Sequence, residues 1–266
     1  MQALVQLRSR FYAITRLFVW RTTNVGLFRR LWIWYYRLGT RAFLSLCRSV
    51  ERATGAEVLE AVYLRRGGGR GEIVAGASDL DFFLVLKPIT SEVETAFVTR
   101  FWRRYFLMQH FFPFWGETLL ADENELRNWL STSTVRAWEV PWSWKLLSGR
   151  AMIHAAPAFP SRRDLFSEGL KNYWEVLQSV LVLSRLPRKM SGEASLGCGL
   201  RLRNAVKSTV DILRFEASAV GRDADLWQLT RDQILHRESS RFAPLPVQKL
   251  SRILRTARPD DTGAEA

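Results

Sequence analysis

The chain has 266 residues, of which 47% are hydrophobic and 24% charged, and it carries a formal net charge of +13. These proportions exclude wholesale disorder, collagen and low-complexity sequence, and they predict a chain that buries a substantial core. No apolar run approaches the ~20 residues that a membrane-spanning helix needs. Two distant cysteines, Cys47 and Cys198, provide neither a disulfide framework nor zinc-site spacing, and no secretory signal pattern is present. We therefore expect a cytoplasmic protein.

The positive charge is concentrated near the N-terminus. Arginine accounts for 33 of the 39 basic residues, and residues 1–50 hold nine arginines and no acid, since the first acid is Glu51. Residues 51–266 include 30 basic and 26 acidic residues, a net charge of only +4. A domain that binds nucleic acid is usually basic over its whole binding face, so the sequence disfavours nucleic acid as the main partner.

Residues 1–55 are expected to form two helices, with breaks at residues 21–24 and at Gly39. Their aromatic side chains interleave with arginines: Trp20, Trp32, Trp34, Tyr35 and Tyr36 with Arg29, Arg30 and Arg37. Three interpretations remain open. The helices pack on the following domain with arginine stems covering apolar surface, they lie on an anionic membrane, or they stack on single-stranded nucleic acid. We expect peripheral attachment to a membrane, with anionic lipid contacted through residues 1–50.

Residues 56–150 read as a small mixed α/β domain. Strand formers at 58–64 end in a glycine cluster at 67–71, and a second apolar strand covers 79–86. A helix follows from Ser91, which with Glu94 predicts a capping box. A third strand is expected at 117–121, and a helix at 123–130 opens with a second capping box, Asp122 with Glu125.

The rest of the chain reads as helical. Helices are expected at 164–185, 200–219, 224–240 and 246–257, forming a helical domain over 151–258, with a disordered tail at 259–266. The predicted fold class is therefore α+β: a small mixed-sheet domain followed by a helical bundle, with basic helices before it.

The stretch between the first two strands carries the candidate chemistry. Asp79 and Asp81 begin a strand that is apolar on both faces, and they share one face because side chains alternate along a strand. Two carboxylates held together there repel each other, and a bound Mg²⁺ or Mn²⁺ is the usual compensation. Just upstream, Gly67 and Gly68 form a turn whose backbone N–H groups can approach an anion closely. Arginines 65, 66 and 70 flank this turn.

This pattern resembles the DNA polymerase beta superfamily of nucleotidyltransferases. The family signature is a hydrophobic strand, Gly-Gly or Gly-Ser, a loop, and then Asp-hydrophobic-Asp-hydrophobic. Here Gly67-Gly68 is followed by the ten residues 69–78 and then by Asp79-Leu80-Asp81-Phe82. The resemblance covers about residues 56–130. The two-domain plan is also similar to that of aminoglycoside nucleotidyltransferases and of small bacterial and archaeal members.

The resemblance implies a set of site residues. A third carboxylate on a neighbouring strand completes the metal site, and the candidates are Glu117, which we prefer, and Asp122. Asp79, Asp81 and Glu117 would then be both catalytic residues and ligands of Mg²⁺ or Mn²⁺. The expected nucleotide-binding residues are Gly67, Gly68, Arg66, Arg70, Ser78 and, from the helical domain, Lys207. Ser78 also fits a loop-stabilising role, and Lys207 fits a solvated helix face.

The resemblance thus implies an enzyme that moves a nucleoside monophosphate from a nucleoside triphosphate to an acceptor hydroxyl and releases pyrophosphate. The expected acceptor is a small molecule or a protein side chain, because no RNA-binding module is visible. Two alternatives remain: a catalytically inactive module that keeps the fold and binds or regulates, and a basic protein associated with membrane or nucleic acid. The position of the third carboxylate discriminates between the enzyme and the inactive module.

Overall fold

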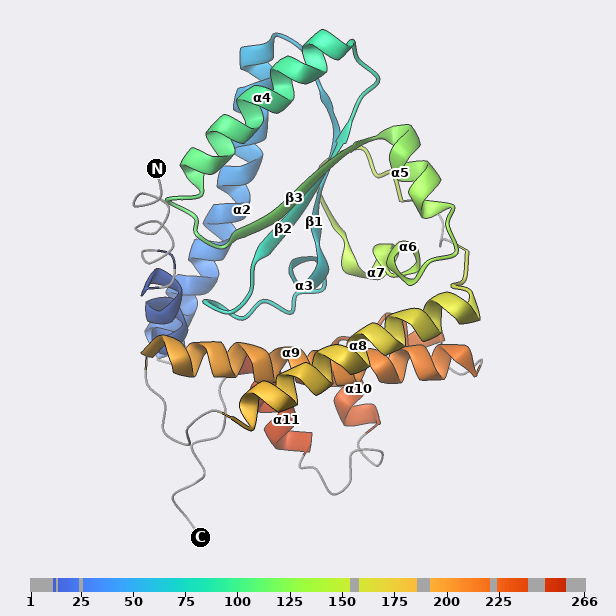
Figure 1. The fold of residues 1–266 in the computed structure, drawn as a ribbon. Helices are drawn as coiled ribbons and strands as arrows, with labels where there is room; N and C mark the ends of the chain where they lie inside the picture. Colours follow the sequence, from blue (N-terminus) through green and yellow to red (C-terminus); the bar gives the residue numbers. More distant parts are fainter. Residues whose placement is uncertain are drawn as a thin grey trace. The chain divides into compact units, whose positions relative to one another are not determined.

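The computed structural model contains helices and one four-stranded mixed sheet, so the protein is α+β, as the sequence predicts (Figure 1). The residues described are 12, 14–23, 26–153, 158–185, 192–220, 224–238 and 247–256. The predicted tail at 259–266 lies outside them. The chain divides into two compact units, Met1–Thr132 with Ala137–Ala158 and Ser133–Arg136 with Phe159–Ala266.

The sheet belongs to the first unit and has the strand order β3-β2-β1-β4. Its strands are β1 Leu59–Arg65, β2 Leu80–Leu86, β3 Trp115–Asp122 and β4 Lys145–Gly149. β1 runs antiparallel to β2 and β4, whereas β3 runs parallel to β2. The first three strands lie close to their predicted positions. The sequence does not predict β4, because this strand is half exposed and lacks a buried apolar run.

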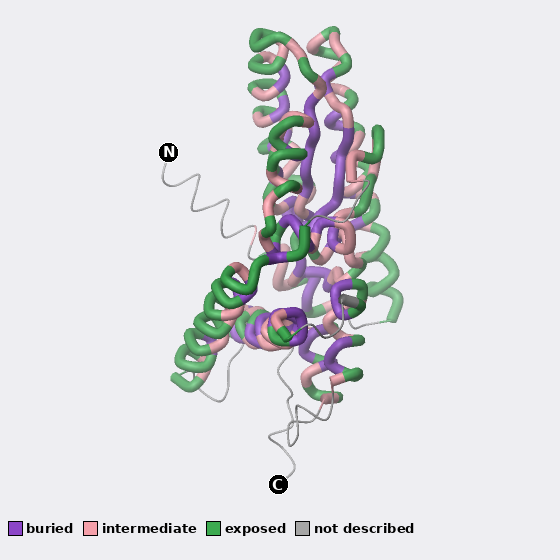
Figure 2. The backbone as a smooth tube through the Cα atoms, turned by 90° about the vertical axis from the view of Figure 1, so that its right-hand side faces the viewer, coloured by how far each residue is buried: buried purple, intermediate pink, exposed green. Residues whose placement is uncertain are grey.

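Two long helices, α2 (Gly26–Thr54) and α4 (Ser91–Met108), cover one face of the sheet. That face carries the side chains Val62, Leu64, Leu80, Phe82, Leu84 and Leu86. Phe43 of α2 is fully buried there and stacks on Phe82, with ring centroids 3.6 Å apart. Figure 2 shows the strands as a buried layer beside helices whose outer turns are exposed. This aromatic layer forms the main core of the first unit.

The predicted helix break at Gly39 is wrong, because α2 runs through this residue without interruption. A Cβ atom at Gly39 would lie 3.3 Å from the Phe112 ring and 3.4 Å from Nε1 of Trp115. The Trp115 indole also donates a hydrogen bond to the Gly39 carbonyl. Glycine is therefore used at this position for close packing of α2 against the start of β3, and not to end a helix.

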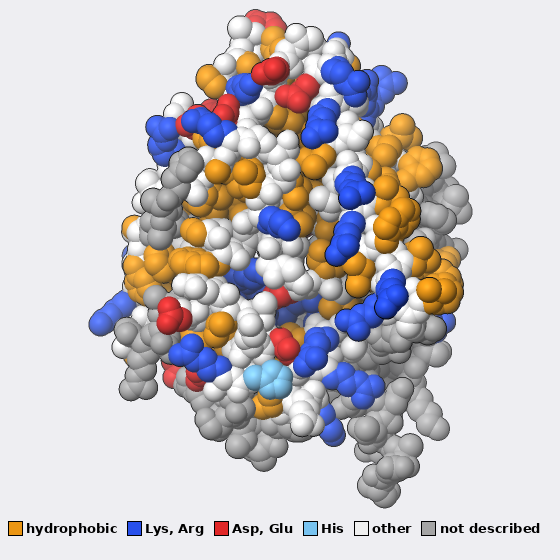
Figure 3. Space-filling model, turned by 180° about the vertical axis from the view of Figure 1, so that it is seen from behind, with side chains coloured by type: hydrophobic (Ala, Val, Ile, Leu, Met, Phe, Trp, Pro, Cys, Tyr) orange, Lys and Arg blue, Asp and Glu red, His pale blue; other side chains and the backbone are white. Residues whose placement is uncertain are grey.

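Residues 14–22 form a shorter helix before α2, and Thr23 follows this helix in a turn. Val19 and Trp20 on this helix are buried, so its inner side belongs to the core of the first unit. Its outer side and that of α2 expose hydrophobic and basic side chains, which interleave along the right-hand side of Figure 3. None of the helices in the described part of the chain is both long and apolar enough to cross a membrane.

The other face of the sheet carries a smaller cluster beneath α5 (Glu123–Leu130). The predicted capping box of α5 is confirmed, since Oδ1 of Asp122 accepts from the Glu125 N–H at 2.8 Å and the Glu125 carboxylate accepts in return. The predicted box at Ser91 is wrong. The N-cap of α4 is Thr90, whose side chain makes no capping bond, so the pattern Ser-x-x-Glu is present but shifted by one residue from the helix start.

The second unit is helical among the described residues. Its elements are α8 Arg162–Leu183, α9 Gly192–Ala219, η1 Ala224–Trp227, α10 Arg231–Arg237 and α11 Val247–Thr256, preceded by part of α6 Val135–Trp138. The helix predicted at 224–240 is divided into η1 and α10. Thr230 forms a capping box with Gln233 and so starts a new helix there.

Replacing Phe43 with alanine should lower the free energy of unfolding by about 3–5 kcal/mol, because the change removes a fully buried ring and leaves a cavity between α2 and the sheet. Urea unfolding followed by tryptophan fluorescence measures this loss. The control is Phe111→Ala, at a ring that is mostly exposed. Equal losses for the two variants would contradict the described core.

Candidate functional site

Three carboxylates gather where β2 and β3 begin. Asp79 stands immediately before β2, Asp81 is the second residue of that strand, and Glu117 is the third residue of β3. Leu80, between the two aspartates, is buried in the main core. Asp81 is largely buried, whereas Asp79 and Glu117 are each about half exposed. The strand pairing therefore brings together the three residues that the sequence predicts as catalytic.

Gly116 allows this close approach. A Cβ atom on Gly116 would lie 2.5 Å from Oδ1 of Asp81 and 2.7 Å from Cβ of Asp79. The N–H of Glu117 donates to the same Oδ1 of Asp81 at 2.9 Å. A shift in the β2–β3 register between Leu80 and Phe82 falls at this point. The irregular pairing thus turns the Glu117 backbone toward Asp81.

Tyr105 of α4 fixes the carbonyl of Gly116. Its hydroxyl donates to that oxygen at 2.6 Å. Burial raises the pKa of Tyr105 to about 12, so the hydroxyl keeps its proton at neutral pH and remains a donor. The main core and the carboxylates are connected through this bond, because Tyr105 also stacks on the buried ring of Trp115.

Arginine side chains neutralise the three carboxylates. Arg66 lies between two of them, with Nη2 3.1 Å from Oε2 of Glu117 and Nη1 3.6 Å from Oδ2 of Asp81. Arg16, on the helix at 14–22, places Nη2 2.5 Å from Oδ1 of Asp79. We call Asp79, Asp81, Glu117, Arg16, Arg65 and Arg66 the carboxylate–arginine cluster. In it each acid has a positive partner, which offsets the repulsion among the acids.

Arg65, the last residue of β1, is the buried cation of this cluster. It pairs with Asp81 in the β1–β2 register, and its guanidinium lies 5.7 Å from the centroid of the Phe83 ring and 5.2 Å from that of Trp144. Burial, followed by the charge of Arg66, lowers the pKa of Arg65, while Glu117 and Asp81 act in the opposite direction. Within the described part of the chain its Nε atom is buried without a hydrogen-bond acceptor, whereas its Nη1 atom forms an ion pair with Oε2 of Glu117 at 3.6 Å. Such a donor is suited to an anionic ligand.

The glycine run after β1 forms a single helical turn, α3 (Arg66–Gly69). Arg66 has a φ of 53°, the left-handed region that non-glycine residues seldom adopt, and strain of this kind concentrates at functional sites. The glycines differ in surroundings. Gly69 packs against the Ser143 carbonyl so closely that no Cβ would fit, and Gly68 packs on Leu64, whereas Gly67 is less crowded. Of the three glycines of α3, Gly67 leaves the most room for a ligand near the backbone.

Other predicted site residues have structural partners outside the carboxylate–arginine cluster. Arg70 is buried and pairs with Glu139, with Nη2 3.1 Å from Oε2. Ser78 stabilises the loop, since its hydroxyl accepts from the Val74 N–H at 2.9 Å and its carbonyl accepts from Tyr36. Asp122 caps α5 and pairs in register with Leu86, at the far end of β2 from Asp81. Its position leaves Glu117 as the third carboxylate.

Lys207 lies on α9 of the second unit and is partly exposed. Arg203, one turn earlier, is buried and donates from Nε to the Leu254 carbonyl at 2.8 Å. Arg203 therefore has a structural role within the helical unit. Contact of Lys207 with a triphosphate stays a prediction.

The donor chemistry of the three carboxylates fits a hard divalent cation such as Mg²⁺ or Mn²⁺. In the arrangement described here, however, no three acidic, histidine or cysteine side chains among the described residues form a preassembled cation site. Arg16 and Arg66 are paired with the carboxylates instead. Binding of a cation would therefore require these guanidinium groups to move aside, for instance toward the phosphates of a nucleotide.

Two residues of the site are missed by sequence reasoning. Arg16 is 63 positions from Asp79, and nothing in its own segment distinguishes it from the eight other arginines before Glu51. Gly116 is visible only as a glycine before the predicted strand. Its requirement for close approach depends on strand register, which the sequence does not reveal.

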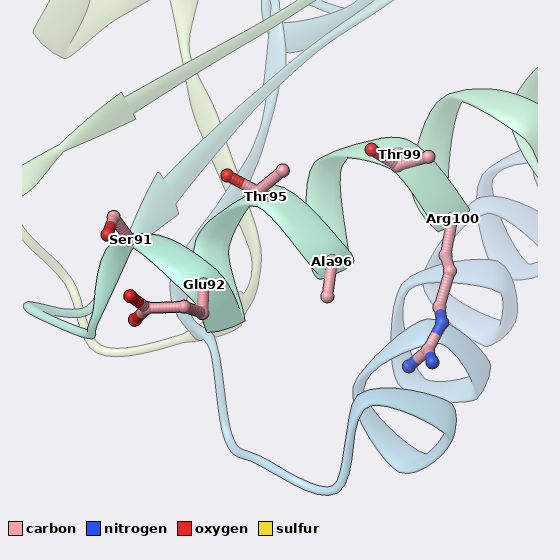
Figure 4. A pocket seen from close by; sticks show the side chains of 6 residues that line it. All are labelled: Ser91, Glu92, Thr95, Ala96, Thr99 and Arg100. Atoms are coloured by element: carbon pink, nitrogen blue, oxygen red, sulfur yellow. The ribbon is translucent and has the colours of Figure 1, made fainter.

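A hollow on the first unit lies elsewhere. It has a volume of about 520 Å³ and is lined by Ser91, Glu92, Thr95, Ala96, Thr99 and Arg100 of α4 (Figure 4). Arg100 points toward α2 and donates to the Ala53 carbonyl. Because Ser91 follows the end of β2, this hollow lies at the opposite end of that strand from Asp79, and it has no cluster of carboxylates.

Comparisons with known proteins add no assignment. No protein-family model matches the chain, and neither a curated protein nor a solved structure does. The interpretation of the site therefore depends on the geometry of its residues.

Replacing Gly116 with alanine should lower the free energy of unfolding by about 1–3 kcal/mol, because the new methyl group would collide with Asp79 and Asp81. Thermal unfolding measures the change. The matched control is Gly197→Ala on α9, where a Cβ meets no atom within 4 Å. That variant should be neutral or more stable, since alanine favours a helix. A neutral Gly116→Ala variant would contradict the close contact between β2 and β3.

Proposed function

We propose that the protein is a metal-dependent nucleotidyltransferase of the DNA polymerase beta type, which moves a nucleoside monophosphate from a nucleoside triphosphate to an acceptor hydroxyl and releases pyrophosphate. The observation that carries the proposal is the convergence of Asp79, Asp81 and Glu117 at adjacent strand starts, next to a glycine turn. Three carboxylates from two neighbouring strands, beside arginines, form a reasonable site for a metal-bound triphosphate.

The arginines of the cluster have a consistent role in this proposal. Nε of Arg65 is a buried donor without an acceptor among the described residues, and a phosphate oxygen would supply one. Arg66 already bridges Asp81 and Glu117, so its guanidinium lies next to the place where a triphosphate would bind. Fixed cations at that place stabilise the charge that develops on the leaving pyrophosphate.

A divalent cation, Mg²⁺ or Mn²⁺, would be held by Asp79, Asp81 and Glu117 and would supply charge neutralisation to the phosphates. Asp81 and Glu117 would also orient Arg66, because both carboxylates form ion pairs with its guanidinium. Gly67 is proposed to contribute a backbone N–H to the phosphates. The acceptor is proposed to be a small hydroxylated molecule or a protein side chain.

A second candidate function is a module that binds a nucleotide or another anion without transferring a group. The observation in its favour is that Arg16 and Arg66 already neutralise the carboxylates, with no preassembled cation site among the described residues. In this candidate the arginines bind the anion, and the acidic residues only hold them in place.

Replacing Asp81 with asparagine should reduce pyrophosphate release by at least about a hundredfold, because it removes a charged ligand from the metal site. Each of the four common nucleoside triphosphates would be tested with Mg²⁺ and with a mixture of hydroxylated acceptors. The matched control is Asp122→Asn, an acid on the same sheet that caps α5. It should retain activity and nearly all of its stability, because asparagine caps a helix about as well as aspartate.

The outcomes separate the candidates. Nucleotide binding with no pyrophosphate release for any triphosphate would favour the binding module. Absence of nucleotide binding with any divalent cation would overturn both. Equal loss of activity in both variants would show that the carboxylate–arginine cluster is not the reacting site.

Replacing Arg16 with glutamine should tighten binding of Mn²⁺ several-fold, since the change removes the positive charge that pairs with Asp79. Electron paramagnetic resonance of free Mn²⁺ measures the affinity without any nucleotide. The control is Arg21→Gln on the same helix. Unchanged or weaker Mn²⁺ binding in the Arg16 variant would show that this ion pair does not compete with a cation.

A further inference from the structure

The outer side of α2 is apolar in the first half of the helix. Leu27, Leu31 and Trp34 follow one another at intervals of four and three residues, which places them on one face. Leu27 is 81% exposed and Trp34 is 55% exposed. The buried residues of α2 lie on its other side: Tyr36, Gly39, Phe43, Leu46, Cys47 and Val50. The exposed apolar face is therefore additional to the face that forms the core.

Two neighbouring elements continue this apolar face. The Tyr35 hydroxyl donates to the Phe111 carbonyl, and the Tyr35 ring stacks on Phe112, so the end of α4 lies beside α2. From there Leu107 (63% exposed) and Phe111 (65% exposed) project outward. The helix at 14–22 also lies beside α2, because the rings of Phe18 and Trp32 are in contact, and this helix exposes Ile14 and Phe18. We call this surface the apolar–arginine face. Its arginines are Arg30, Arg37 and Arg41. Its apolar residues are Ile14, Phe18, Leu27, Leu31, Trp34, Leu107 and Phe111.

Exposed arginines run beside the apolar residues of α2. Arg30, Arg37 and Arg41 occupy neighbouring positions on its outer side. No acidic residue occurs in the sequence before Glu51. The same holds for the second half of α4 and the loop after it, since residues 95–116 include Arg100, Arg103 and Arg104 but no acid. The segments 26–50 and 95–116 are thus both basic and free of acid, and Figure 3 shows the mixture of basic and hydrophobic side chains along α2.

We propose that the apolar–arginine face docks in the plane of an anionic lipid bilayer. Aliphatic and aromatic side chains would enter the headgroup boundary while the arginines contact lipid phosphates. Single-stranded nucleic acid is also anionic, but it binds proteins mainly by base stacking on aromatic rings. Leu27, Leu31, Ile14 and Leu107 cannot stack on bases, and they favour the bilayer. The argument for docking does not rest on the transfer reaction proposed above.

Sedimentation of the full-length protein with vesicles tests the proposal. Vesicles of phosphatidylcholine with roughly a third of phosphatidylglycerol should bind it, and vesicles of phosphatidylcholine alone should bind it at least about tenfold more weakly. The triple variant L27S/L31S/W34S should lose at least about tenfold in affinity for the anionic vesicles. The matched control, F166S/L170S/Y173S, changes three exposed apolar residues of α8 and should bind like the wild type.

A charge variant keeps the test decisive if the serine variant unfolds. Arg30, Arg37 and Arg41 are exposed, so replacing all three with glutamine leaves the core intact and should also weaken binding about tenfold. Raising the salt from 0.1 to 1 M shortens the screening length from ~10 to ~3 Å and should weaken wild-type binding. Absence of vesicle binding, equal binding to neutral vesicles, or unchanged binding by the charge variant would overturn the proposal. A preference for single-stranded RNA over anionic vesicles, lost in the charge variant, would assign the face to nucleic acid instead.

Discussion

The pairing of β3 with β2 through Gly116 is the contact on which the site depends. Because this residue has no side chain, the start of β3 lies against Asp79 and Asp81, and the Glu117 N–H reaches Asp81. Tyr105 holds the Gly116 carbonyl from the helix side, and its ring belongs to the aromatic core. The same few contacts consequently determine both the packing of the core and the geometry of the carboxylates. A substitution that disturbs the core there would also displace the carboxylates.

The fold was accessible from sequence wherever a segment has one dominant pattern. β1 and β2 consist mainly of apolar strand formers, and α5 begins at a capping box, so their positions are predicted closely. Gly39 shows the limit, because a glycine that ends a helix and a glycine that admits a neighbouring ring look the same in a sequence. β4 shows another, since an edge strand owes its existence to its partner β1 more than to its own residues.

The candidate site was accessible only in part for a similar reason. The alternation of side chains along a strand places Asp79 and Asp81 on one face, and the strand position of Glu117 makes it the better third carboxylate. Their arginine partners depend on tertiary structure. Arg16 arrives from a distant helix, and Arg70, adjacent to the glycine turn, points instead to Glu139. Proximity in sequence is a poor guide to which of several identical cations a carboxylate meets.

The helix at 14–22 contributes residues both to the carboxylate–arginine cluster and to the apolar–arginine face. Its Arg16 pairs with Asp79, while Ile14 and Phe18 belong to the apolar–arginine face. Any ligand that shifts this helix at one surface changes the free energy of binding at the other, and the coupling is reciprocal. A nucleotide that draws Arg16 away from Asp79 would thereby alter the affinity for lipid, and lipid would alter the affinity for the nucleotide by the same factor. Through one short helix, nucleotide binding would then depend on whether the protein is attached to a membrane.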